Sequence, residues 1–454
     1  MKDLTKGNIF KTFFLFGLPL VLSGILTQAY SIIDSSIAGH FLGEVGLAST
    51  SATTPLATFI NSMFWGFCVG FSVYVARLFS AKEYHKLKSA FYTCLILIFV
   101  LGFVFGGLLT LFYKPLAELL HIDPALRRDS FLYFSIINAG RGFIVLGTLL
   151  VFTLNAMGIS GFTFWMSLLS GVLNVAGNVL SIIVLNMGVA GIAISTVLSS
   201  LIVNLLYFLK IRACFKQLGD TKPVRLKFSY LKNAVPYALP NMAQQAVMYA
   251  VSLLTSPLVN GMGISATASY SVVSHIYNFI ASVYQNSART VSTYSAQCVG
   301  SKQYEKIKKG VGVGLLQGLA FATPFILGCA VFHEAVCGIF LKSDASALVK
   351  EYSYAFCKIY LPFIYFNVLN NLLHALYRGV KAMGHLFWMT LLGSAVKLIF
   401  SVAFIEQLGM EGIYLSWVIS WLLEAILTTV LFFIGGWKPT VEEEQPAEVI
   451  EDKA

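Results

Sequence analysis

The residue with the clearest chemical potential in this chain is an aspartate within a long apolar stretch. Gln28 and Ser31 stand at i and i+3, and Asp34 continues the series, so the three side chains lie near one face of a helix. Such a face on an otherwise apolar helix should look into a cavity. Loss of water there disfavours the ionised carboxylate. Asp34 could therefore exchange protons or bind Na⁺; the alternative is a carboxylate hydrogen-bonded at the outer membrane interface.

Other polar residues of the first half could surround this acid. Asn174 and Asn178 stand at i and i+4, and Asn138 and Arg141 at i and i+3. We expect Arg141 to be the partner of a buried acid, because an unpaired guanidinium is expensive within a membrane. The alternative is that the amides only hold helices together, which is common in membrane proteins.

The second half has an uncharged, aromatic and amide-rich character. Asn367, Asn370, Asn371 and His374 occupy i, i+3, i+4 and i+7 and form one helical stripe. Such a wall suits large amphipathic or cationic ligands, although a hydrated, ligand-free interface has the same composition. Lys397 and Glu424 should pair and neutralise each other. The candidate residues of a substrate cleft are Asn138, Arg141, Gln245, Tyr249, Tyr277, Asn367, Asn370, Asn371 and His374.

These residues are positioned by segments that must lie in lipid. Of the 454 residues 57% are hydrophobic and only 11% charged, against about 25% charged in soluble domains. Pattern and length predict an all-α integral membrane protein, since the alternation typical of a β-barrel is missing. The expected spans are residues 11–36, 46–76, 89–112, 128–156, 162–185, 188–210, 233–259, 264–296, 309–332, 350–377, 385–406 and 410–434.

The same pattern occurs twice along the chain. Leu18-Pro19 and the stretch 81–88 return as Leu239-Pro240 and 301–308, and Ala156-Met157-Gly158 returns as Ala382-Met383-Gly384. Duplicated bundles are typical of secondary transporters. We predict twelve transmembrane helices in two pseudo-symmetric six-helix lobes that share one orientation. The predicted parts are an N-terminal lobe (1–210), a cytoplasmic linker (211–232), a C-terminal lobe (233–436) and an acidic, disordered tail (437–454).

Charge placement predicts orientation and excludes other functions. The net charge of +10 comes from Lys and Arg concentrated in the segments on one side of the membrane. This placement predicts a protein of the bacterial inner membrane with both termini in the cytoplasm, and it predicts no nucleic-acid partner. The N-terminal apolar run is too long for a cleavable signal peptide. The seven scattered cysteines indicate no disulfide framework. Nucleotide and metal motifs are lacking, so we expect no cofactor.

The chain resembles the MATE family of multidrug and toxic compound extrusion proteins over about residues 8–435. The resemblance rests on Leu18-Pro19 with Asp34 and Gly39, on the paired basic stretches 81–86 and 300–306, and on the order of further short matches. These are Asn155-Ala156-Met157-Gly158, Asn174-Val175-Ala176-Gly177-Asn178, Gly188-Val189-Ala190-Gly191-Ile192-Ala193 and Tyr377-Arg378-Gly379. It implies two lobes around a central cleft and export by antiport against H⁺ or Na⁺.

The resemblance also implies residue roles. Asp34 matches the acidic coupling position, and Asn174 an asparagine that accompanies it. Asn178 stands where DinF-like members often carry a second aspartate, whereas Met248 and Asn367 stand near positions where NorM-like members carry acids. We therefore expect a divergent member, closer to the DinF-like proteins, that couples through Asp34.

The predicted protein is a monomeric antiporter that exports amphipathic or cationic compounds by alternating access. Gln28, Tyr30, Asn174 and Asn178 would shape the Asp34 site, which could hold Na⁺. One alternative is a flippase for lipid-linked sugars, which should show a more cationic cleft than Arg141 and Lys397 offer. The other is a membrane-embedded enzyme, for which the chain lacks a clustered acid–base set.

Overall fold

The computed structural model describes residues 1–119, 122–219, 224, 226, 228–341 and 346–437, and this part of the chain folds into helices joined by short connections. The first half contains α1 (Ile9–Ser51), α2 (Thr54–Ser80), α3 (Tyr84–Leu111), α4 (Tyr113–Leu119), α5 (Arg127–Ala139), α6 (Arg141–Ala156), α7 (Ser160–Val179) with the π-helical turn η1 (Leu180–Val184), and α8 (Gly188–Gln217). The second half contains α9 (Phe228–Gly261), α10 (Ile264–Gly300), α11 (Glu305–Val331), α12 (His333–Gly338), α13 (Ala347–Ala355), the turns η2 (Phe356–Tyr360) and η3 (Leu361–Phe363), α14 (Ile364–Gly379) and α15 (Met383–Phe433).

The twelve-span plan is confirmed, with differences in detail. By length and composition, eight described helices could cross a membrane, or nine if α5 and α6 form one span bent by 50°. The helices α9 and α10 are also long enough to cross a membrane but are more polar than those eight. The helix α15 contains two spans, which meet where Gly409 leaves helical geometry. The expected fourth span, 128–156, is therefore a broken helix, because Gly140 separates α5 from α6.

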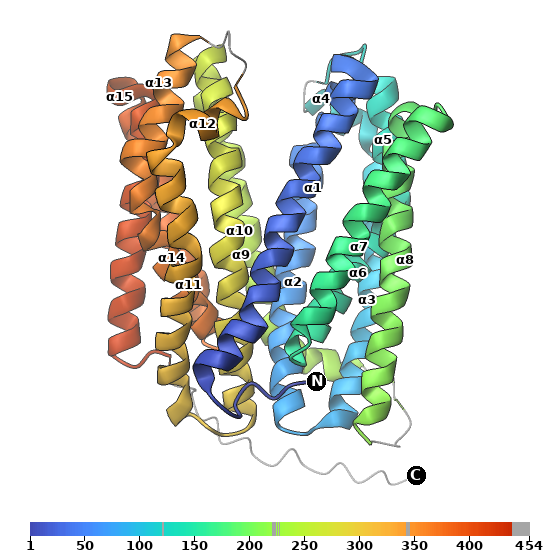
Figure 1. Cartoon of the computed structure of the whole chain (residues 1–454), viewed down its shortest axis with the longest axis vertical. Coiled ribbons are helices and arrows are strands. Elements are labelled where there is room, and N and C mark those ends of the chain that lie inside the picture. The colour runs from blue at the N-terminus through green and yellow to red at the C-terminus, as the bar shows by residue number, and fades with distance from the viewer. Residues whose placement is uncertain (120–121, 220–223, 225, 227, 342–345, 438–454) are drawn as a thin grey trace.

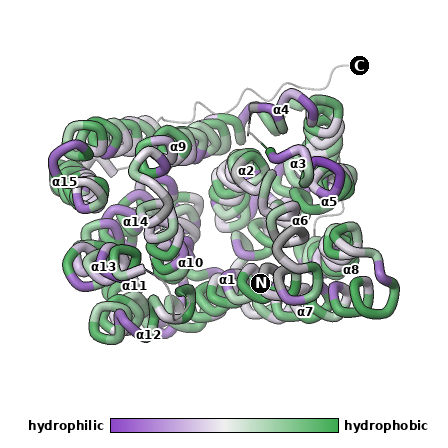
Figure 2. The backbone as a smooth tube through the Cα atoms, turned by 90° about the horizontal axis from the view of Figure 1, so that it is seen from above, coloured by the Kyte–Doolittle hydropathy of each residue, from purple (hydrophilic) through white to green (hydrophobic). Residues whose placement is uncertain are grey.

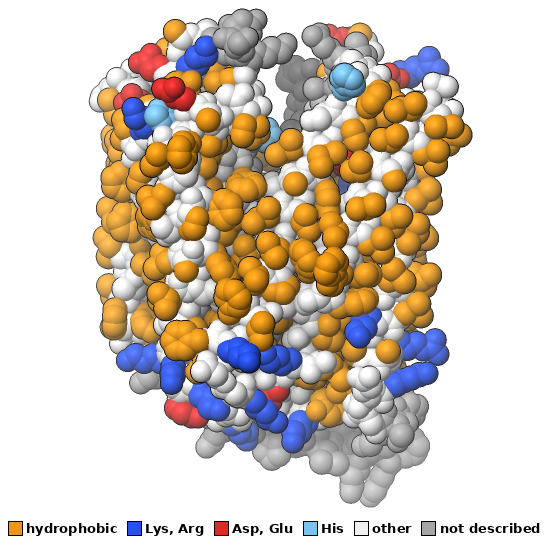
Figure 3. Space-filling model, viewed as in Figure 1, with side chains coloured by type: hydrophobic (Ala, Val, Ile, Leu, Met, Phe, Trp, Pro, Cys, Tyr) orange, Lys and Arg blue, Asp and Glu red, His pale blue; other side chains and the backbone are white. Residues whose placement is uncertain are grey.

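The helices form two lobes. Figures 1 and 2 show α2 to α8 on one side and α9 to α15 on the other, with α1 and α10 at the boundary. Apolar side chains cover the outer face, and Lys and Arg side chains gather at the end where the N-terminus lies (Figure 3). The helices around the predicted linker extend into it, since α8 continues to Gln217 and α9 begins at Phe228. The predicted tail lies outside the described residues except for Trp437.

The duplication is visible in the backbone. Positive φ angles occur at Gly43 and Gly263, at Lys82 and Lys302, and at Gly188 and Gly409, so the backbone leaves helical geometry at equivalent places in the two halves. This conformation is strained for residues with a Cβ atom, which makes its recurrence at two lysines informative. One sequence match is displaced: the turn at Gly158 (φ 77°) corresponds to the turn at Lys381 (φ 68°), not to Gly384.

Glycines let the two lobes approach closely along α2 and α9. A Cβ atom at Gly70 would collide with the backbone carbonyl of Tyr237, and one at Gly66 would lie 2.6 Å from the carbonyl oxygen of Asn241. Arg77 at the end of α2 donates a hydrogen bond of 2.6 Å to the Tyr237 hydroxyl. Small residues at such positions allow backbones to pack closely in membranes, where van der Waals contact drives helix association.

Gln297 of α10 joins the lobes at the end where the N-terminus lies. Its Oε1 accepts a hydrogen bond of 2.8 Å from the Leu4 amide, and its Nε2 donates one of 3.0 Å to the Ala156 carbonyl, at the end of α6. The Lys2 amide donates to the Met157 carbonyl beside it. Gln297 and Leu4 are buried. The N-terminal segment is thus hydrogen-bonded to both lobes at once.

Candidate functional site

Asp34 lies in an amide cluster between α1 and α7. Its Oδ1 accepts a hydrogen bond of 2.9 Å from Asn178 Nδ2. Asn178 is fully buried, and its own Oδ1 has no hydrogen-bond partner in the described part of the chain. Asn174 and Asn178 are one helical turn apart on α7, as their spacing predicts, and they face α1. The carboxyl is therefore held by neutral amides.

The side-chain amide of Asn174 faces the same carboxyl. With its nitrogen turned inward, Nδ2 lies 2.7 Å from Asp34 Oδ1 and its oxygen accepts from Thr196 Oγ1 at 3.1 Å. With its oxygen turned inward, it accepts from Asn178 Nδ2 at 3.2 Å. An inward nitrogen suits a carboxylate, whereas an inward oxygen suits a protonated carboxyl that donates. The preferred amide orientation therefore depends on the charge of Asp34.

Two of the predicted companions of Asp34 have other contacts. The Tyr30 hydroxyl donates to the Leu168 carbonyl at 3.3 Å, and its ring packs against Gly171 of α7. Gln28 lines the cavity between the lobes. Both residues therefore lie on α1 near Asp34, but Tyr30 packs against α7 and Gln28 faces the cavity.

The expected pairing of Arg141 with Asp34 is wrong. Arg141 Nε donates to Asn138 Oδ1, and its Nη1 donates to Asn61 Oδ1, both at 2.7 Å. Asn138 and Arg141 are each only 1% exposed, because Gly102 and Gly106 of α3 lie directly against this segment. Both residues brace the break between α5 and α6, and neither lines the two cavities described next.

A central cavity of about 510 Å³ lies between the lobes. Its wall comes from α1, α2, α6 and α7 on one side and from α9 and α10 on the other. Among the predicted cleft residues, Gln245 and Tyr249 line it. The remaining polar lining includes Ser23, Thr27, Gln28, Asn61, Ser62, Asn155, Ser282, Gln285, Asn286 and Arg289. Both lobes thus line this cavity with a mixture of polar and apolar side chains, and Arg289 is the one charged residue among the described residues of its lining.

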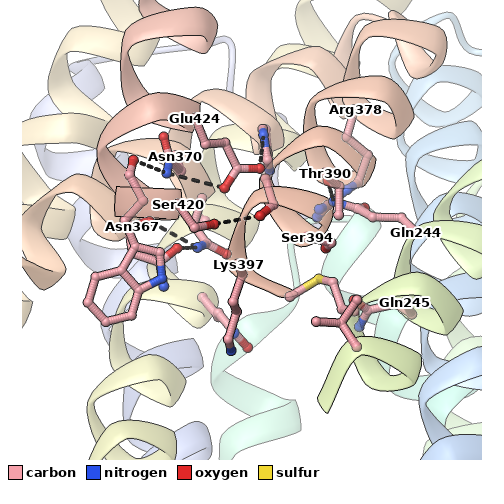
Figure 4. A pocket seen from close by; sticks show the side chains of 18 of the residues that line it. Gln244, Gln245, Asn367, Asn370, Arg378, Thr390, Ser394, Lys397, Ser420 and Glu424 are labelled. Atoms are coloured by element: carbon pink, nitrogen blue, oxygen red, sulfur yellow. Dashed lines mark hydrogen bonds and ion pairs between the residues drawn. The ribbon is translucent and has the colours of Figure 1, made fainter. Parts of the chain in front are cut away.

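A second, smaller cavity of about 130 Å³ lies within the C-terminal lobe (Figure 4). It contains the predicted stripe of Asn367, Asn370, Asn371 and His374, together with Tyr277 and Gln245. The two cavities share Trp65, Gln245, Gln285 and Arg289, and are therefore adjacent. The structure thus brings the predicted residues of the C-terminal lobe together in one cavity, except Tyr249, which lines the central cavity, and separates them from Asn138 and Arg141.

Two arginines of this cavity are not among the site residues that the sequence predicts. Arg289 and Arg378 line it together with Lys397. The positive-inside pattern of the sequence predicts residues 289–309 and 378–381 to be cytoplasmic segments, but α10 continues to Gly300 and Arg378 belongs to the last turn of α14. The repeat could have indicated the position of Arg289: the stretch 301–308 corresponds to 81–88, so the helix before it should continue almost to residue 301.

The predicted pair of Lys397 and Glu424 is also wrong. Glu424 Oε1 lies 3.4 Å from His374 Nε2, and its Oε2 accepts from Asn370 Nδ2 at 3.3 Å. Lys397 Nζ lies instead 4.1 Å from the ring centre of Trp417, a cation–π contact. Asn370 and His374 lie on the same stripe of α14 and both contact the Glu424 carboxyl, which explains why Glu424 pairs with them and not with Lys397.

Comparison with known proteins shows a family for the whole chain. The family model MatE matches twice, at residues 19–180 and 240–403, one match in each half. The probable multidrug resistance protein YoeA of Bacillus subtilis is 22% identical over 429 residues, covering 91% of both chains. The multidrug export protein MepA of Staphylococcus saprophyticus is 25% identical over 289 residues, covering 60% of this chain and 61% of MepA.

Solved structures share the fold. A MOP superfamily transporter from Pyrococcus furiosus superposes with a TM-score of 0.88 at 17% identity, covering 95% of this chain and 97% of that one. The Vibrio cholerae MATE transporter VcmN gives 0.86 at 16% identity, covering 94% and 98%. An outward-facing MATE transporter gives 0.84 at 17% identity, covering 95% and 96%. The doubled match of the family model spans more than half of the chain and shows that the chain belongs to the MatE family of multidrug efflux transporters and is a multi-pass membrane protein, not an enzyme.

Proposed function

We propose that this protein exports an organic amphipathic compound in exchange for H⁺ or Na⁺, by alternating access of the central cavity. The observation that carries the proposal is the Asp34 cluster, a carboxyl held by Asn174 and Asn178 inside the N-terminal lobe. It lies further along α1 than Gln28, which lines the cavity. The multidrug export named for MepA and the probable multidrug resistance named for YoeA are in line with this proposal.

The arrangement of the lobes favours an outward-facing state. The space-filling view is hollowed between the lobes at the end opposite the N-terminus (Figure 3). Lys and Arg side chains gather at the N-terminal end, and the positive-inside rule assigns that end to the cytoplasmic side of the bacterial inner membrane. The cytoplasmic end is closed by the Gln297 contacts and by the packing of α2 on α9.

Coupling would follow from the two orientations of the Asn174 amide. A proton on Asp34 favours the oxygen-inward orientation and a bare carboxylate the nitrogen-inward one, and this change alters the contact with Thr196 on α8. Na⁺ would bind instead to Asp34 together with the unpartnered Asn178 Oδ1. Either ion shifts the lobe equilibrium only if it binds one state more tightly than the other.

The test is transport by purified protein in liposomes under separately imposed proton and sodium gradients. Efflux of a fluorescent organic compound is compared for wild type, Asp34→Asn and the control Glu118→Gln, which removes an exposed carboxylate on α4. We expect Asp34→Asn to lose gradient-driven efflux at least tenfold, while the control matches wild type. Efflux by Asp34→Asn at the wild-type rate under a driving gradient would contradict coupling through Asp34.

A further inference from the structure

We propose that the cavity of the C-terminal lobe binds the anionic group of the transported compound, a carboxylate, sulfonate or phosphate, through Arg289, Arg378 and Lys397. The substrate class would then be amphipathic anions instead of the organic cations that the aromatic and amide composition suggests. This inference rests on the proposed function in one respect, that the adjoining central cavity is the transport path.

The three cations are not neutralised by protein carboxylates. No carboxylate of the described residues lies within ion-pair distance of Arg289, Arg378 or Lys397. The Nε atoms of Arg289 and Arg378 are buried and have no hydrogen-bond partner there. Buried guanidinium groups normally have their donors satisfied, so two unpartnered Nε–H groups on residues that line one cavity point to an acceptor that the described residues do not supply.

The acid of this cavity is directed elsewhere. Glu424 lies against His374 and Asn370, and among the described residues no ion pair joins its carboxyl to Arg289, Arg378 or Lys397. Figure 4 shows Glu424 with Asn370 on one side of the pocket, while Arg378 and Lys397 approach it separately. The described lining therefore holds three arginine or lysine side chains and one acidic side chain, so the basic groups are in excess.

The remaining polar groups of the wall are suited to hydrogen bonds with anionic oxygens. Gln244, Gln245, Thr390, Ser394 and Ser420 line the same pocket (Figure 4). Gln244 Nε2 already donates to Thr390 Oγ1 at 2.9 Å, and Ser420 Oγ donates to the Gly393 carbonyl at 2.7 Å. Among these five described residues of the wall, the donors without such a contact are the Gln245 amide and the hydroxyls of Thr390 and Ser394. A compact anion could therefore be solvated by the wall while its charge is balanced by the guanidinium groups.

Arg289 connects this anion site with the central cavity. Its guanidinium carbon lies 4.5 Å from the ring centre of Phe152 and 5.2 Å from that of Trp65, both from the N-terminal lobe. Arg289 and Trp65 line both cavities. An amphipathic anion could thus place its charged end near Arg289 and its apolar part against the rings of Trp65, Phe152 and Tyr249 in the central cavity.

The arginine contacts also cross between the lobes. Moving the lobes apart would separate Arg289 of α10 from Trp65 of α2 and Phe152 of α6, and would leave its charge without ring contacts. An anion bound at Arg289 would offset that loss. The substrate therefore stabilises the arrangement in which the ring contacts are weakest, which is the differential affinity that alternating access needs.

A matched pair of probes tests the sign of the charge. Dansyl-taurine carries a sulfonate and dansyl-choline a quaternary ammonium on the same fluorophore, and their binding is measured by fluorescence on purified, monodisperse protein in detergent. We expect dansyl-taurine to bind wild type more tightly. Arg289→Gln and Arg378→Gln should each weaken it by about tenfold or more, as expected for the loss of a charge-assisted hydrogen bond.

Two further variants separate charge from folding. Arg289→Lys keeps the cation and should retain most of the affinity, while Lys308→Gln removes an exposed cation of α11 outside the cavities and should change nothing. If an arginine variant fails to yield folded protein, Lys397→Gln is the substitute. Tighter binding of dansyl-choline than of dansyl-taurine, or unchanged binding of dansyl-taurine by the Gln variants, would overturn the proposal.

Vesicle assays identify the source of the anion and separate this proposal from the proposed function. Arginine-dependent transport of dansyl-taurine indicates a soluble substrate, and arginine-dependent flipping of fluorescent phosphatidylglycerol, with no flipping of phosphatidylcholine, indicates a lipid headgroup; both support anion binding. Asp34-dependent transport of dansyl-choline without binding of dansyl-taurine would overturn anion binding alone. Arginine-dependent binding of dansyl-taurine, with no gradient-driven transport of either dansyl probe and no phosphatidylglycerol flipping, would overturn the export function alone.

Discussion

Replacing Gln297 with alanine should shift the protein away from the state seen here. The side chain makes two buried hydrogen bonds, to the Leu4 amide at 2.8 Å and the Ala156 carbonyl at 3.0 Å, and these link α10 to the N-terminal segment and the end of α6. Each such bond contributes about 1 kcal/mol net. Their loss therefore corresponds to about 2 kcal/mol, or about a thirtyfold change in the equilibrium between lobe arrangements, if the opposite state lacks both bonds.

Spin labels placed at Lys86 and Lys308 report this change. Both residues are exposed and lie at the end that Gln297 closes, one in each lobe. In Gln297→Ala, double electron–electron resonance should show a population with a longer distance between the two spin labels, which is minor in wild type. Gln217→Ala, an exposed glutamine at the end of α8, serves as the control. An unchanged distance distribution in Gln297→Ala would show that these bonds do not hold the lobes together.

Three further results are expected. Gly70→Leu should lower the melting temperature by several degrees, because its side chain must displace the Tyr237 backbone at a cost of about 1–3 kcal/mol; an unchanged melting curve would contradict the close packing of α2 and α9. Asn178→Ala should reduce coupled transport about tenfold with normal protein yield, because Asp34 loses its 2.9 Å donor; wild-type transport rates would remove Asn178 from the site. Glu424→Gln should strengthen dansyl-taurine binding severalfold, because the one carboxylate of the cavity disappears; weaker binding would oppose the charge argument.

The fold was largely predictable from the sequence because the same pattern of apolar spans and turns occurs in both halves of the chain. Apolar length defines most spans, and the doubled turns at Gly43 and Gly263 define the period. The break at Gly140 was not predictable, since a single glycine inside an apolar run is common in membrane helices and only the packing of α3 against α5 and α6 shows that the helix bends there.

The candidate site was predictable where it depends on helical spacing within one element. Asn174 and Asn178, and the stripe from Asn367 to His374, share faces as expected. Pairing between elements was not predictable: Arg141 contacts Asn61 of α2, and Lys397 contacts Trp417 from the other half of α15. These partners depend on helix rotation and depth, which composition does not determine.

The polarity of α10 has a consequence for how the protein enters the membrane. Its buried side chains include Ser282, Asn286, Thr290, Ser295 and Gln297, which are covered by α1, α2, α11 and α14 only after those helices have assembled. A segment of this composition gains little from lipid by itself. The insertion machinery should therefore release α10 into the bilayer together with neighbouring helices, and the chain between Ile264 and Gly300 should insert poorly when it is translated alone.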